Sequence, residues 1–142
     1  MGGIEWLIEA FGCSETILQD QEKLANLFHA IVLEMQLRPI GNPVWHQFPE
    51  TGGVTGVWLL QESHLAIHTF PEFQSACLNL FCCSNRPSLD WKTRLPHLLG
   101  ASEIHVRDYQ RFYNREKRQG PDEPEFRHDE DTYWFGLSHA TL

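Results

Sequence analysis

The stretch VTGVWLLQESHLAIHTFPEFQSACLNLFC, residues 54–82, decides the fold class. Runs rich in β-branched and aromatic residues, separated by short links, are typical of consecutive strands. The stretch predicts three strands, over Val54–Leu60, Ser63–Thr69 and Ala76–Cys82. Because links of hairpin length join antiparallel neighbours, this part of the chain predicts an antiparallel sheet.

The segments on either side complete the sheet and add two helices. Further strands are predicted over Ile4–Phe11, Val44–Phe48 and Glu103–Gln110. Asp20 can cap a helix over Gln21–Met35, whose apolar residues recur at helical spacing. Asp90 can cap a second helix of about ten residues that ends near Gly100. The sequence therefore predicts an α+β fold, a two-layer sandwich whose mainly antiparallel sheet carries two helices packed on one face.

The length of the chain, 142 residues, suits a single domain with a modest core. We assign this domain to residues 1–113. Residues 114–142 are highly charged and contain Gly-Pro and Glu-Pro pairs, which is typical of a linker or a disordered tail. The tail regains apolar character near its end, and we expect Tyr133–Phe135 to dock on the domain or on a second subunit.

The charge balance limits the classes of partner. The formal net charge is −8, from 19 acidic and 11 basic residues. Nucleic-acid binding relies on clustered Lys and Arg, so no nucleic-acid partner is expected. No apolar run approaches the roughly 20 residues of a membrane span, and the N-terminus lacks the features of a signal peptide. Four cysteines without CxxC spacing favour reduced thiols, so we expect a cytoplasmic protein that does not bind membranes.

Acids, imidazoles and hydroxyls crowd into the middle of the opening stretch, and three interpretations are open. The segment can be a half-buried strand whose polar residues face water, and the pattern alone favours this reading. It can be a metal site in which His64 and His68 join Cys82 or Cys83. It can also carry nucleophilic chemistry, with Ser63 beside a histidine base and a thiol.

The spacing of Ser63 and His68 constrains the third interpretation. The two residues are five positions apart, so a regular strand places them on opposite faces. If they cooperate, the chain must bend between them or Ser63 must lie on an irregular turn, where backbone strain is plausible.

The segment ESHLAIHTFPE, residues 62–72, resembles the signature of the short prokaryotic S-adenosylmethionine decarboxylases, which are pyruvoyl-dependent proenzymes. Other segments resemble this family in the same order along the chain. They are EAFGC at 9–13, FPETGGVTGVWLLQESH at 48–64, NLFCC at 79–83 and LDWKTRL at 89–95. The resemblance covers residues 4–112, and Phe70 replaces a residue that is usually Trp.

The resemblance implies a chain that makes its own cofactor. It implies self-cleavage between Glu62 and Ser63, after which Ser63 becomes a pyruvoyl group that forms a Schiff base with the substrate amine. His68 matches the family's processing histidine, and Thr55 stands where a serine usually assists processing. Cys83 matches the residue that donates a proton after carbon dioxide has left. No metal is expected.

Two thiols lie side by side at the end of this strand. Cys83 matches the family's proton donor, whereas Cys82 replaces a residue that is commonly Thr. Successive side chains of a strand point to opposite faces, so only one thiol should face the site. We expect that thiol to be Cys83.

The resemblance also implies a small-molecule substrate and an assembly. Phe48 and Phe70 are the aromatic residues expected to hold an adenine ring, and Glu72 and Glu9 are the acids expected near the substrate. The implied product is decarboxylated S-adenosylmethionine, the aminopropyl donor for spermidine biosynthesis. The implied assembly is a dimer of αβ units with sites near the subunit interface.

Two alternatives remain at this point. One is the same pyruvoyl chemistry on L-ornithine or L-arginine, whose distal cation would need a buried carboxylate. The other is an unprocessed, non-catalytic paralogue that regulates a partner subunit. Retention of Ser63, His68 and Cys83 together argues against this second alternative.

Overall fold

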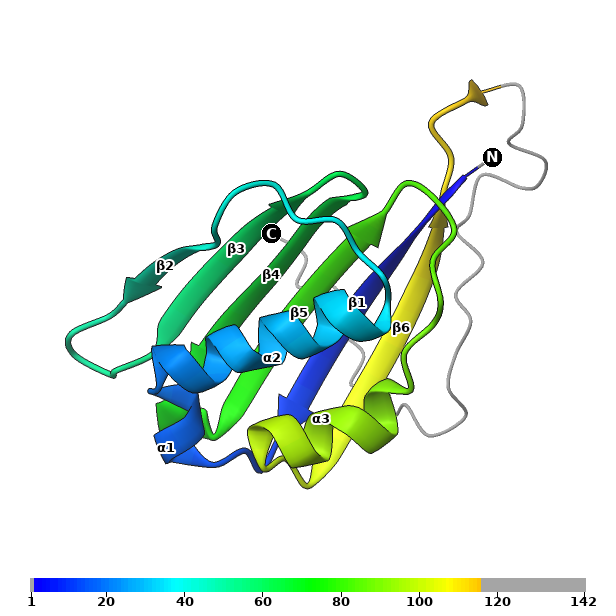
Figure 1. Ribbon diagram of the computed structural model, residues 1–142. Coiled ribbons are helices and arrows are strands. Elements are labelled where there is room, and N and C mark those ends of the chain that lie inside the picture. The colour runs from blue at the N-terminus through cyan, green and yellow to red at the C-terminus, as the bar shows by residue number, and fades with distance from the viewer. Residues whose placement is uncertain (1, 116–142) are drawn as a thin grey trace, which may run out of the picture.

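The computed structural model describes residues 2–115 as a six-stranded sheet with helices on one face (Figure 1). The strands lie in the order β2-β3-β4-β5-β1-β6, and each neighbouring pair is antiparallel. They are β1 Gly3–Phe11, β2 Val44–Gln47, β3 Val54–Leu60, β4 Ser63–Phe70, β5 Ser75–Cys82 and β6 Glu103–Arg111. The helices are α1 Glu15–Leu18, α2 Gln21–Glu34 and α3 Trp91–Leu99, with a 3-10 turn, η1, at Pro71–Phe73. The α+β two-layer sandwich expected from the sequence is confirmed.

The strands and the two long helices agree with the sequence expectations to within one residue at most ends. Sequence analysis missed α1 and η1, which are too short to show a periodic pattern. None of the helices among residues 2–115 is long and apolar enough to cross a membrane. The expected docking segment Tyr133–Phe135 and most of the expected tail lie outside the described residues.

Side-chain caps determine where the two long helices begin. The Asp20 side chain accepts hydrogen bonds from the amides of Glu22 and Lys23 at the start of α2. At α3, Asp90 accepts from the amide of Thr93. Gly100 then ends α3 in the left-handed region, with φ of 65°, which glycine adopts without strain.

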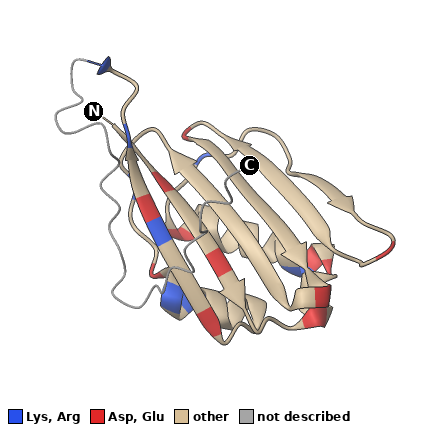
Figure 2. Cartoon of the chain, turned by 180° about the vertical axis from the view of Figure 1, so that it is seen from behind, with Lys and Arg blue, Asp and Glu red and all other residues tan. Residues whose placement is uncertain are grey.

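The two faces of the sheet have different surroundings. The helices cover one face, and the apolar residues of α2 that pack there are fully buried. The alternate residues of β4 that face them are Leu65, Ile67 and Thr69. The other face carries no helix within residues 2–115, as Figure 2 shows from behind. Within the sheet, charged residues lie mainly on β1 and β6 (Figure 2).

Candidate active site

The hairpin between β3 and β4 presents the expected cleavage site at one end of the sheet (Figure 1). Leu60 pairs with Ser63, so Gln61 and Glu62 form the turn and the Glu62–Ser63 peptide bond leads into β4. Ser63 has a φ of 149°, a backbone conformation that side-chain-bearing residues rarely adopt. The strain expected from the sequence is therefore present at this residue.

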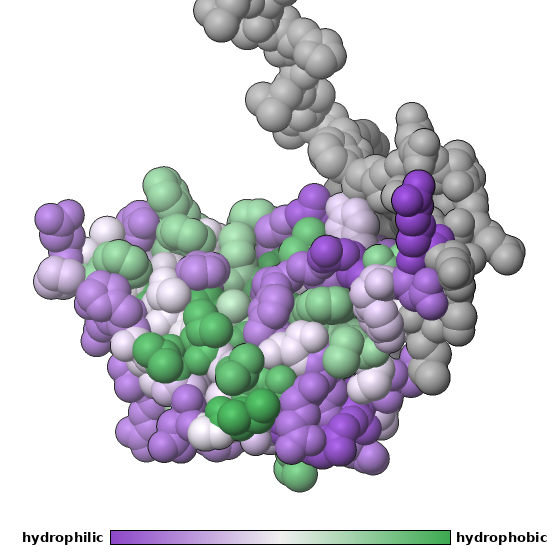
Figure 3. All heavy atoms as spheres, turned by 90° about the horizontal axis from the view of Figure 1, so that it is seen from above, coloured by the Kyte–Doolittle hydropathy of each residue, from purple (hydrophilic) through white to green (hydrophobic). Residues whose placement is uncertain are grey.

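The carbonyl group of that peptide bond is already hydrogen-bonded. The backbone N–H of Cys83 donates to the Glu62 oxygen at 2.7 Å. Ser63 pairs with Cys82 in the β4–β5 register, which brings the end of β5 beside the turn. Figure 3 looks onto this end of the molecule, where apolar and hydrophilic residues are interspersed.

The Glu62 side chain is fully buried beneath the turn and carries a charge. Its carboxylate accepts from the Arg38 amide at 3.0 Å, from Arg38 Nε at 3.1 Å and from Arg86 Nη2 at 2.7 Å. Burial alone would raise the pKa of Glu62. The hydrogen bonds from Arg38 and the charge of Arg86 outweigh that effect and hold the pKa below its usual value.

Sequence analysis did not identify Arg38 and Arg86 as functional residues. Both lie in loops of ordinary composition, outside the motif that surrounds Ser63. The only available signal was Glu62 itself, because a carboxylate that becomes buried needs a cationic partner. The sequence did not show that Glu62 is buried.

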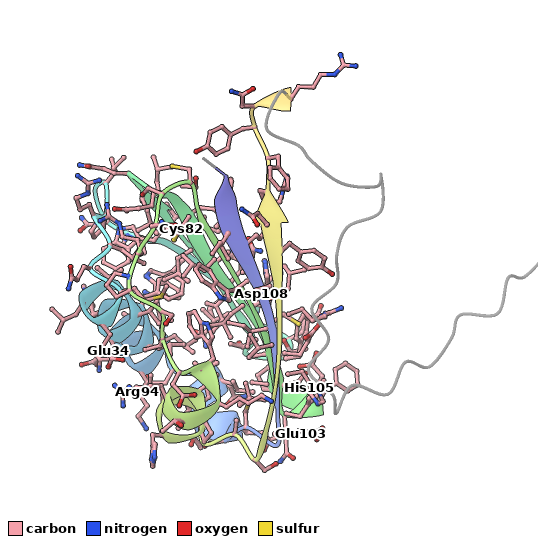
Figure 4. The ribbon with its side chains drawn as sticks, turned by 90° about the vertical axis from the view of Figure 1, so that its right-hand side faces the viewer. Glu34, Cys82, Arg94, Glu103, His105 and Asp108 are labelled. Carbon is pink, nitrogen blue, oxygen red and sulfur yellow. The ribbon has the colours of Figure 1, made fainter. Side chains whose placement is uncertain are left out.

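The two adjacent thiols have different surroundings. Cys82 is 1% exposed and points to the helix side of the sheet, as Figure 4 shows. Burial raises the pKa of the Cys82 thiol to about 11. Cys83 is half-buried, and its carbonyl oxygen accepts from the Tyr113 hydroxyl at 3.1 Å. Cys83 is thus the more accessible of the two thiols beside the turn.

The expected processing pair lies on β3 and β4, at the end opposite the turn. Thr55 Oγ1 and His68 Nδ1 are 3.0 Å apart across the β3–β4 pair. The β4–β5 register is unbroken from Ser63 to Phe70, so no bulge bends the strand between Ser63 and His68. At about 3.3 Å per residue, five positions separate their Cα atoms by about 16 Å. One subunit therefore does not bring His68 to Ser63.

His64 lies on the open face in a polar network that runs towards β6. Its Nε2 is 2.6 Å from Asn79 Oδ1, and Asn79 Nδ2 donates to Glu5 at 2.9 Å. Glu5 also accepts from Arg111. Because the Glu5 carboxylate can only accept, the Asn79 oxygen faces the ring and His64 Nε2 carries a proton.

The residues expected to contact substrate lie with His68, away from Ser63. Phe48 follows β2 and Phe70 ends β4, and both side chains are exposed. Glu72 is exposed on η1. Glu9 forms an ion pair with Arg107 on the open face. The expected site residues thus fall into two groups, one at each end of β4.

The metal interpretation has no support in the geometry. Within residues 2–115, no three His, Cys, Asp or Glu side chains lie close enough together to hold a metal ion. His64 and His68 share a face of β4 but are about 13 Å apart along the strand.

Comparisons with known proteins agree with the sequence resemblance. The S-adenosylmethionine decarboxylase family matches residues 4–112. A protein of Moorella thermoacetica named S-adenosylmethionine decarboxylase proenzyme is 35% identical over 106 residues, which cover 74% of this chain and 83% of the relative. A proenzyme of the same name from Syntrophomonas wolfei is 40% identical over 80 residues, or 62% of that relative.

A solved structure shares the fold. The crystal structure of the adenosylmethionine decarboxylase from Aquifex aeolicus matches 84% of this chain and 98% of that chain, with a TM-score of 0.69 and 26% sequence identity. Within the described part of the chain, the family match runs from the second residue of β1 to the end of β6. By sequence and by fold, the chain belongs to the S-adenosylmethionine decarboxylase family, a family of decarboxylase enzymes.

Proposed function

We propose that the chain is a self-processing, pyruvoyl-dependent decarboxylase that converts S-adenosylmethionine to the aminopropyl donor for spermidine biosynthesis. The observation that carries this proposal is the Glu62–Ser63 peptide bond. Its carbonyl oxygen accepts from the Cys83 N–H, and Ser63 has a φ of 149°. A polarised carbonyl next to a strained backbone favours attack on this bond.

In the first step, the Ser63 hydroxyl oxygen attacks the carbonyl carbon of Glu62. The bond from that carbon to the Ser63 nitrogen breaks, and the hydroxyl proton passes to the departing nitrogen. An amide thereby becomes an ester and Ser63 gains a free amine. The Cys83 N–H is placed to stabilise the negative charge that develops on the Glu62 oxygen.

In the second step, Ser63 loses its α-proton to a base and its Cβ–Oγ bond breaks. Glu62 departs as a carboxylate that keeps this oxygen. The remaining dehydroalanine rearranges to an imine, and water hydrolyses the imine with release of ammonia. The products are a chain of residues 1–62 and a chain of residues 63–142 whose first residue is a pyruvoyl group.

The residues around position 63 fit this group. When formed, a pyruvoyl group supplies a ketone that withdraws electrons as the substrate loses carbon dioxide. We assign Cys83 to return a proton to the carbon that has lost carbon dioxide. Its half-buried position beside the turn supports this role, whereas Cys82 is enclosed in the core.

A second copy of the chain supplies the rest of the site in this proposal. His68 and Thr55 lie about 16 Å from Ser63 along one regular strand, so they act on the Ser63 of a partner. The sheet face that carries His68, which bears no helix within residues 2–115, is the surface that packs against this partner. A dimer of αβ units follows, with each site shared between two subunits.

The surroundings of the two candidate acids support S-adenosylmethionine over a basic amino acid. Ornithine or arginine would need a buried carboxylate for its distal cation. Glu9 already pairs with Arg107, and Glu72 is exposed. The exposed rings of Phe48 and Phe70 are available to stack on an adenine ring of a nucleoside substrate.

Mass spectrometry and a substrate panel test the proposal. The purified chain should separate into residues 1–62 and 63–142 under denaturing conditions, with the second fragment blocked to Edman sequencing. Ser63→Ala should stay full length because it has no hydroxyl to attack with. The processed enzyme should release carbon dioxide from S-adenosylmethionine.

Two results would contradict parts of the proposal. A wild-type chain that stays uncut after long incubation would exclude self-processing. Release of carbon dioxide from ornithine or arginine, and none from S-adenosylmethionine, would exclude the substrate and leave the pyruvoyl chemistry intact.

A further inference from the structure

The strained backbone at Ser63 needs something to hold it. Rare backbone conformations cost about 1–3 kcal/mol each and persist only where the surrounding structure imposes them. The residue before Ser63 is the most heavily restrained in the turn. Three hydrogen bonds hold the Glu62 carboxylate, and a fourth holds its carbonyl oxygen.

We propose that Arg38 and Arg86 act as positioning residues for self-cleavage, because they clamp the Glu62 side chain and so hold the scissile bond against the Cys83 N–H. This inference rests on the proposed function. In this inference, the contacts of the Glu62 carboxylate hold the turn in position. Neither arginine touches the bond that breaks.

The two arginines contact Glu62 from different segments of the chain. Arg38 belongs to the segment after α2, which is itself bonded to the hairpin: the Gln61 amide donates to the Arg38 carbonyl at 2.8 Å. Pro39 also bridges to Leu60. Arg86 belongs to the loop after β5, the strand that ends at the Cys83 N–H. The two arginines therefore tie the turn to both of its neighbouring segments.

Arg86 is the less exposed of the two arginines. Its side chain is 20% exposed, against 60% for Arg38, so its charge is less screened by water. Its Nε is also a buried donor with no hydrogen-bond partner among the described residues. Cleavage turns Glu62 into a residue with two carboxylates. The Arg86 guanidinium offers its positive charge and its unpaired Nε donor to the new carboxylate.

Cleavage kinetics of the full chain test the clamp. Labelled precursor is made by cell-free translation, and the loss of full-length chain is followed over time. Arg86→Met and Glu62→Gln should each slow cleavage by about 10- to 100-fold, because small misplacements of reacting groups cost that much. Arg86→Lys should restore part of the rate. Arg94→Met is the matched control, since it removes the Arg94–Glu34 ion pair in the helix layer (Figure 4).

A double variant separates positioning from a general loss of stability. If Arg86 acts through Glu62, Glu62→Gln with Arg86→Met should cleave no more slowly than the slower single variant. The double variant also leaves no unpaired buried charge at this position. If Arg86→Met alone does not fold, the cleavage rate of the double variant still tests the proposal. Thermal melting of each chain in the uncut Ser63→Ala background establishes which variants fold.

The outcomes are distinct. Folded Arg86→Met and Glu62→Gln chains that cleave at the wild-type rate would overturn the clamp and leave the proposed function standing. A double variant whose slowing is the product of the two single effects would show that Arg86 does not act through Glu62. A wild-type chain that never cleaves would remove both proposals.

Discussion

Cys82 and Cys83, at the end of β5, differ in burial, and the proposed function gives them different roles. Cys83→Ala should still self-cleave, because the backbone N–H that bonds the Glu62 carbonyl is retained. It should lose turnover by roughly 10²–10⁴-fold, the usual contribution of a general acid. Carbon dioxide release by the processed variant measures this effect.

Cys82→Ala is the control for that prediction. Its thiol is enclosed in the core, so we expect near-normal turnover and a loss of about 1 kcal/mol in the free energy of unfolding. Should Cys82→Ala lose activity while Cys83→Ala keeps it, the assignment of the proton donor is wrong.

The charge on Glu62 makes the stability of the uncut chain depend on pH. Its pKa is lowered in the folded state from the ordinary value of 4.5, so the folded state favours the charged form. The stabilisation is fully present above about pH 4.5 and is lost as the pH falls through the lowered pKa.

Urea unfolding of Ser63→Ala, with and without Glu62→Gln, measures this contribution. The free energy of unfolding of the chain that keeps Glu62 should fall more steeply below pH 4.5 than that of the chain that also carries Glu62→Gln. Other acids with lowered pKa values, such as Glu5, are common to both chains and cancel. Parallel pH profiles would show that folding does not lower the pKa of Glu62.

At the scale of elements, capping side chains position the helix layer that covers the core. Asp20→Ala removes two hydrogen bonds at the start of α2 and should lower the free energy of unfolding by about 1 kcal/mol. Ser14→Ala is the matched control, because Ser14 precedes α1 and makes no side-chain cap. Chemical denaturation of both variants in the uncut background tests this; equal losses would contradict the role of the Asp20 cap.

The β3–β4 hairpin separates residues that the proposed function assigns to one reaction. Its regular register carries Thr55 and His68 at one end and Ser63 at the other. A straight strand cannot fold back on itself within five residues, so the proposed function requires His68 to reach the Ser63 of a second molecule.

At the scale of the whole molecule, complementation between two inactive chains tests this sharing. One chain carries Ser63→Ala and keeps His68; the other carries His68→Ala and keeps Ser63. Produced together, they should form a mixed dimer with one complete site, and the His68→Ala chain should be cleaved. Different tags distinguish the two chains on a denaturing gel.

Each variant produced alone is the control and should remain uncut. If His68→Ala stays uncut when it is co-produced with Ser63→Ala and mixed dimers are present, His68 does not act across subunits. Sedimentation of the wild-type protein should independently show a dimer of αβ units.

Local sequence pattern by itself determines most of this fold. The alternation and turn residues of residues 54–82 predict three antiparallel strands, and Asp20 and Asp90 predict where α2 and α3 begin. These features depend on neighbours a few residues away, which the sequence shows directly. The motif around Ser63 likewise indicates the family and the expected cleavage site.

Tertiary structure alone decided which distant residues meet. Arg38 and Arg86 reach Glu62 from loops 24 residues away on either side, and no local pattern encodes those contacts. The distance from Ser63 to His68 became clear only when the β4 register proved unbroken. Contacts of this kind depend on how whole elements pack, because burial and pairing are properties of the assembled chain rather than of any short segment.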